Sequence, residues 1–113
     1  MPDTAPPPVP VPNVSPWDAD KIFLMLVEPA RRRILAALAS GNAQPATSLK
    51  GCTRLRLDAT FKHLTAMRKA GLLVMKPDQT DGRRMLYSLA PSVPVVKTET
   101  GAVIDFGFCL IRL

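Results

Sequence analysis

Residues 56–71, RLDATFKHLTAMRKAG, contain the pattern that decides the fold of this chain. At 3.6 residues per turn, Thr60, Leu64 and Met67 fall on one stripe of a helix. The opposite side carries polar side chains: Asp58, Lys62, Thr65 and Lys69. We expect a helix over 58–70, in which Asp58 accepts backbone N–H bonds at the start and Gly71 ends the last turn.

The neighbours of this helix complete a motif. Three shorter helical patterns precede it, and a strand, a loop and a second strand follow it directly. That order is typical of a helix-turn-helix with a wing, which presents one helix face to the DNA major groove. The sequence predicts a mainly α fold with a small β content (α+β). The expected elements are helices from 17 or 18 to 27, over 29–40 and over 45–50, a turn over 51–55, and strands over 72–75 and 83–89 around a loop over 76–82.

The C-terminal residues predict a β-hairpin, with strands over 95–98 and 102–113. Both faces of the second strand are largely apolar, and such a strand needs cover on both sides. The domain supplies one cover, and we expect a second subunit to supply the other. The chain therefore divides into a Pro-rich arm (1–16), a winged-helix domain (17–91) and a β-hairpin extension that contributes to a dimer contact (92–113).

The arm contains seven prolines and almost nothing that would fill a core. Such a composition favours an extended, polyproline-like or disordered segment. A ligand for a proline-recognising domain is the alternative interpretation, and a flexible tail is the simpler one.

Positive charge is concentrated in one part of the chain. The stretch from Lys50 to Arg84 holds nine Lys and Arg residues against three Asp residues, and the remaining residues balance six against six. The whole net charge of +6 therefore lies on the helix-turn-helix and wing. A polyanion is the partner that such a distribution indicates.

Several classes of protein are disfavoured. A length of 113 residues suggests one domain, and no secretory or membrane-spanning pattern is visible, so a cytoplasmic protein is expected. Cys52 and Cys109 lack the spacing of a metal site, and two reduced thiols are favoured over a disulfide. His63 stands alone, without the acid, base or nucleophile sets that catalysis requires. We expect no enzyme activity, no metal and no cofactor.

Two groups of side chains have more than one interpretation. Arg31 to Arg33 invite a phosphate-binding role, but Arg31 projects close to the apolar stripe of its helix. We therefore expect Arg31 to pair with an acidic side chain near the interior. In the preceding helix, Phe23 and Val27 belong to an apolar surface larger than a small exposed helix needs, and part of it is expected to contact a second subunit.

Three stretches resemble the ArsR-type winged-helix transcriptional regulators. Glu28 to Leu38, EPARRRILAAL, is similar to the family's Asp-Pro-x-Arg-x-x-Ile-Leu-x-x-Leu opening. Lys62 to Leu72, KHLTAMRKAGL, resembles the end of its reading helix, and Gly82 to Leu89, GRRMLYSL, resembles its wing. Together they span roughly residues 18–90 in the family's order. The resemblance implies a dimeric, cytoplasmic DNA-binding regulator, commonly a repressor.

The sequence also departs from that family. The Cys-x-Cys element of metal-sensing members is missing, and Cys52 alone builds no thiolate site. Phe61 stands where the family usually has a small polar residue; we expect it to tuck inward, with contact to a thymine methyl group as the alternative. The family's closing helix is replaced by the expected hairpin.

The resulting hypothesis is a homodimer that places two copies of the 58–70 helix in successive major grooves of double-stranded DNA. Lys62 is the expected base contact, and the wing over 76–84 would lie on the backbone or in the minor groove. The candidate DNA-binding residues are Arg54, Arg56, Asp58, Ala59, Lys62, Thr65, Lys69, Lys76, Arg83 and Arg84. A winged-helix protein-interaction module without sequence-specific DNA binding is the alternative.

Overall fold

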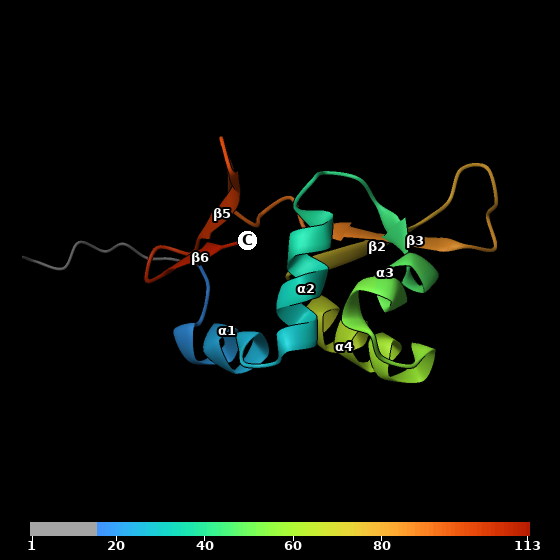
Figure 1. The fold of residues 1–113 in the computed structure, drawn as a ribbon, viewed down its shortest axis with the longest axis horizontal. Helices are drawn as coiled ribbons and strands as arrows, with labels where there is room; N and C mark the ends of the chain where they lie inside the picture. The colour runs from blue at the N-terminus through green and yellow to red at the C-terminus, as the bar shows by residue number, and fades with distance from the viewer. Residues whose placement is uncertain (1–15) are drawn as a thin grey trace, which may run out of the picture.

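A computed structural model describes residues 16–113, and the expected Pro-rich arm lies outside these residues except for Pro16. The described chain is α+β, as predicted, and contains four helices and two small antiparallel sheets. The helices and the first strands carry the helix-turn-helix and wing, and three further strands follow them (Figure 1). The elements are α1 (Ala19–Leu26), α2 (Pro29–Leu38), β1 (Gln44–Pro45), α3 (Ala46–Thr53), α4 (Leu57–Lys69), β2 (Leu73–Pro77), β3 (Met85–Leu89), β4 (Val95–Thr98), β5 (Gly101–Asp105) and β6 (Leu110–Arg112).

Local signals set most helix ends. Asp18 caps α1 by accepting a hydrogen bond from the backbone N–H of Lys21 at 3.2 Å. Pro29 occupies the first turn of α2, where its missing N–H is not needed. Gly71 ends α4 with a φ of +84°, and the N–H groups of Gly71 and Leu72 donate hydrogen bonds to carbonyls of the last helical turn.

Two expected ends are wrong. Gly51 does not close the first helix of the motif, because α3 continues to Thr53 and ends at Arg54, whose left-handed φ of 61° makes the turn. Asp58 makes no capping hydrogen bond, because Arg56 occupies the N-cap position of α4 and Asp58 lies inside the first turn. There its carboxylate lies near the positive end of the helix dipole and pairs with Arg56 at 3.6 Å.

The wing is built on a three-stranded sheet in the order β1-β3-β2. β2 and β3 pair antiparallel, with Leu73 opposite Leu89 and Pro77 opposite Met85, so the loop between them forms the wing tip. Tyr87 at the centre of β3 is buried. The sheet therefore holds the wing against the helical core.

The last segment differs from the predicted hairpin. β4 and β5 pair as expected, but the chain then turns and returns as β6, which gives a sheet in the order β4-β5-β6. The break lies at Gly107, which has a φ of 93° and donates its N–H to the Asp105 carboxylate at 2.9 Å. Phe106 N–H also bonds the Cys109 carbonyl across the turn at 3.0 Å. A glycine turn therefore divides the apolar stretch that we expected to be one strand.

One core joins the helices to both sheets. Ile34, Leu35 and Leu64 are fully buried at its centre, and Ile104 and Phe106 of the C-terminal segment belong to the same cluster. The C-terminal sheet and α1 lie at one end of the described chain, and α3, α4 and the wing lie toward the other (Figure 1). Among residues 16–113, no helix has both the length and the apolar character needed to cross a membrane.

Candidate nucleic-acid interface

Two buried threonines join the helices of the helix-turn-helix. The hydroxyl oxygens of Thr53 on α3 and Thr60 on α4 lie 3.1 Å apart, and the two residues are 1% and 0% exposed. Thr53 also accepts the N–H of Leu55 at 3.2 Å, and Thr60 donates to the carbonyl of Arg56 at 3.0 Å. These bonds satisfy the polar groups of the turn and fix α4 relative to α3.

Solvent reaches nearly all of the ten predicted site residues. Ala59 is half-buried, and the other nine are exposed: Arg54, Arg56, Asp58, Lys62, Thr65, Lys69, Lys76, Arg83 and Arg84. Within residues 16–113, Arg56 and Arg84 are the cations of this set that form an ion pair with an acid, Arg56 with Asp58 at 3.6 Å and Arg84 with Asp78 at 3.1 Å. The remaining cations of the set are therefore available to an external anion.

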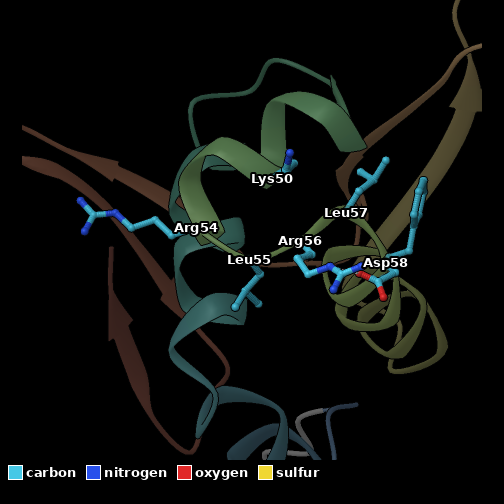
Figure 2. Close-up of a pocket in the computed structure, with 7 residues that line it drawn as sticks. Lys50, Arg54, Leu55, Arg56, Leu57 and Asp58 are labelled. Carbon is cyan, nitrogen blue, oxygen red and sulfur yellow. Dashed lines mark ion pairs between the residues drawn. The ribbon is translucent and has the colours of Figure 1, made fainter.

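An open groove runs between the end of α3 and the start of α4, with a volume of about 780 Å³. Its polar lining comes from Lys50, Arg54, Arg56 and Asp58. Figure 2 shows Arg56 and Asp58 side by side, while the Arg54 side chain points away from them. Lys50 was not among the predicted site residues, although it belongs to the basic stretch that indicated the site.

The wing is held in shape by Asp78. Its carboxylate accepts the N–H and hydroxyl of Thr80 at 3.0 and 2.9 Å and pairs with Arg84 at 3.1 Å. The hydrogen bonds from Thr80 and then the Arg84 charge lower the pKa of Asp78, against an opposing effect of burial. Arg84 therefore has a structural partner, whereas Arg83 has an exposed guanidinium at the same tip.

The prediction that Arg31 pairs with an acidic side chain is wrong. Its Nε donates to Nδ1 of His63 at 3.0 Å, and its Nη1 lies 3.5 Å from the carbonyl of Met25. Arg32 bonds the carbonyl of Leu26 in the same way. Arg31 thus links α1 and α2 to α4 through an imidazole nitrogen, and His63 is a hydrogen-bonding residue on the flank of α4.

The expected inward direction of Phe61 is also wrong. Its side chain is 43% exposed, because Thr60 and Leu64 fill the buried side of α4 and leave Phe61 at the edge of that stripe. Phe61 lines the groove at the turn and a second hollow of about 280 Å³ beside the wing.

Neither cysteine belongs to a cluster that would bind a metal. Cys52 and Cys109 are both free thiols, and Cys52 donates to the carbonyl of Leu49 at 3.2 Å. Burial, together with the Asp105 carboxylate, raises the pKa of Cys109. Residues 16–113 contain no group of three or more His, Cys, Asp and Glu residues placed to hold a metal ion.

Solved structures share this fold. The chain is 31% identical to a protein of E. coli described as a predicted DNA-binding transcriptional regulator, with a TM-score of 0.56, and the match covers 66% of this chain and 75% of that one. The chain belongs to the ArsR-type winged-helix family of transcriptional regulators. No protein-family model and no curated protein sequence matches it.

Two further solved structures agree with this fold. Rv0081 of M. tuberculosis is 29% identical, with a TM-score of 0.57 over 64% of this chain and 69% of that one. Mb0332 of Mycobacterium bovis, described as a homodimeric winged helix-turn-helix DNA-binding domain and a possible ArsR-family regulator, is 24% identical, with a TM-score of 0.55 over 64% of this chain. The chain spans 63% of the Mb0332 fragment and 42% of another structure with the same fold.

Proposed function

We propose that this ArsR-type protein is a homodimeric regulator that binds a specific sequence of double-stranded DNA and represses transcription in the cytoplasm. The observation that supports the proposal is the joint position of α4, the turn before it and the wing. These elements lie toward the same end of the molecule (Figure 1). Their cations are exposed, and all except Arg56 and Arg84 lack an ion pair to an acid among residues 16–113. Duplex DNA is the polyanion whose major groove accepts a single helix.

Within this proposal, the exposed face of α4 reads bases. Lys62 lies opposite the buried stripe and would donate to a guanine edge, while Asp58 would accept from a cytosine amino group. Ala59 and Thr65 lie beside them on the same helix. The remaining cations would bind phosphates and set the register of the protein on the duplex: Arg54, Arg56, Lys69, Lys76, Arg83 and Arg84.

A second copy of the chain would cover the apolar surface at the other end. Phe23, Leu24 and Val27 of α1 are 51%, 71% and 65% exposed, and Leu110 of β6 is 67% exposed. Phe23 packs edge-on against Phe108 with ring centroids 5.4 Å apart, so α1 contacts the C-terminal segment. This supports the proposed division into a winged-helix domain over 17–91 and a dimer-forming extension over 92–113. Repression would follow because a dimer seated on a promoter excludes RNA polymerase.

Selection of bound sites from random duplex DNA tests the proposal. We expect enrichment of a two-fold symmetric sequence whose half-sites lie one helical turn apart. Arg83→Ala should weaken binding to all sequences and reduce the slope of log affinity against log salt by about one. Lys62→Ala should instead lower affinity by roughly 1–3 kcal/mol, with relaxed preference at one position of each half-site.

The opposite results are also specific. Uniform weakening by Lys62→Ala across scrambled sites would assign Lys62 to a phosphate. Absence of any enriched sequence, together with a stable complex with a different protein, would favour the protein-interaction module instead.

Leu24→Lys should convert the dimer to a monomer in sedimentation equilibrium, and an unchanged mass would place the dimer contact elsewhere.

A further inference from the structure

Phe61 is an apolar side chain on an otherwise polar face of α4. It follows Asp58 by three residues and precedes Thr65 by four, and these intervals place all three on one exposed side of the helix. Lys62 lies next to it on the same side. Because 43% of Phe61 remains exposed, the fold itself does not use the whole ring for packing.

The surroundings of the ring are open on two sides. On α4, a shallow hollow is lined by Phe61 with Lys62, Thr65, Ala66 and Lys69. Toward the wing, the ring lines a second hollow together with Thr47, Arg83 and Met85, among other residues. A ligand lying across α4 and the wing would therefore meet the phenyl ring between two sets of cationic side chains.

We propose that Phe61 selects thymine at one position of each half-site by contact with its C5-methyl group. This inference rests on the proposed function. The base edges in the major groove present hydrogen-bond donors and acceptors, and the thymine methyl is the apolar group among them. A phenyl ring cannot form hydrogen bonds with the donors and acceptors of the other base edges. The thymine methyl is therefore the group whose contact with the ring is favourable. 5-Methylcytosine carries the same group and would be accepted in the same place.

The expected effect is small but measurable. The hydrophobic gain from burying one methyl group corresponds to about a fourfold difference in affinity per half-site. Removal of the phenyl ring should remove most of that discrimination, because its neighbours in the hollow on α4 are Lys62, Thr65, Ala66 and Lys69, and none of these presents an apolar group larger than a methyl at its exposed end.

The test uses the full chain and the site selected from random DNA. Each thymine is replaced in turn by deoxyuridine, which removes the methyl group and leaves every hydrogen-bonding atom. Wild-type protein should lose about fourfold in affinity at one position of each half-site. Phe61→Ala should bind the thymine and deoxyuridine sites equally, and Phe61→Leu should keep part of the difference. Asn42→Ala, at an exposed residue between α2 and β1 that belongs to neither the proposed DNA-binding set nor the dimer-forming extension, is the control and should behave as wild type.

Cytosine and 5-methylcytosine at the sensitive position give a second comparison. The wild-type protein should bind the 5-methylcytosine site more tightly than the cytosine site, and Phe61→Ala should bind the two sites equally. The inference is overturned if specific binding persists but no deoxyuridine substitution matters, or if Phe61→Ala keeps the wild-type methyl preference. Absence of specific duplex binding by wild type would overturn the proposed function as well.

Discussion

The hydroxyl pair at the helix-turn-helix should show strong energetic coupling. Thr53 and Thr60 are buried with their hydroxyl oxygens 3.1 Å apart. When Thr60 donates to the Arg56 carbonyl, its oxygen can accept the proton of Thr53, which otherwise donates to the Lys50 carbonyl. Replacement by valine keeps the side-chain shape and the approximate helix propensity, so the change in stability reports the hydrogen bonds. The double-mutant cycle of Thr53→Val and Thr60→Val therefore isolates the contact between the hydroxyls.

The structure sets the expected size of each effect. Thr60→Val removes one partner of Thr53, whose hydroxyl can then donate to the Lys50 carbonyl at 3.1 Å, so the expected loss is about 1 kcal/mol. Thr53→Val also leaves the N–H of Leu55 without its acceptor, which raises the expected loss to about 1–3 kcal/mol. In the double variant the shared bond is lost once, so the summed single losses should exceed the double loss by about 1 kcal/mol.

Urea unfolding at constant pH gives the free energy of unfolding of the wild type, the two single variants and the double variant. A difference of about 1 kcal/mol corresponds to roughly 4–8 °C in Tm for a domain of this size. Thr65→Val, at an exposed threonine on the same helix, is the control and should change stability by less than about 0.5 kcal/mol. Additive losses within about 0.3 kcal/mol would refute the role of the hydroxyl contact.

Three further changes test other parts of the fold. Gly51→Ala should stabilise the protein by about 0.5–1 kcal/mol because Gly51 lies inside α3 beside open space, whereas Gly71→Ala should destabilise it by about 1–2 kcal/mol because its φ is +84°; thermal unfolding shifts of the same sign would contradict this. Asp78 has a lowered pKa, so its carboxylate stabilises the folded wing at neutral pH and loses that effect as the pH falls below about 4 through the lowered value. Asp78→Asn should therefore flatten the acid side of the unfolding free energy against pH, and parallel curves would refute the role of the carboxylate. Arg31→Met should cost about 1–2 kcal/mol by leaving Nδ1 of His63 without its donor, while His63→Gln keeps an acceptor and should cost less in the same urea assay; the reverse order would show that the pair does not hold the helices together.

The sequence by itself determined the order of elements and several of their ends. Periodicity placed α4 around Leu64, and the start of α2 at Pro29 and the stop at Gly71 depend on groups within a few residues along the chain. Because these are local hydrogen bonds and local conformational preferences, they are visible without a fold. The exposure of Lys62 and Lys69 followed from the same helical pattern.

Only the tertiary structure decided which distant groups meet. Arg31 and His63 are 32 residues apart, and their contact depends on how α2 packs on α4. Phe61 lies at the edge of the buried stripe. Thr60 and Leu64 occupy the buried side of the helix, so the Phe61 side chain stays partly in solvent. The turn at Gly107 likewise depends on aromatic packing of Phe106 and Phe108 near α1. Local preference fixes where a helix begins and ends, but a side chain at the boundary between core and solvent takes its place from neighbours that only the folded chain brings together.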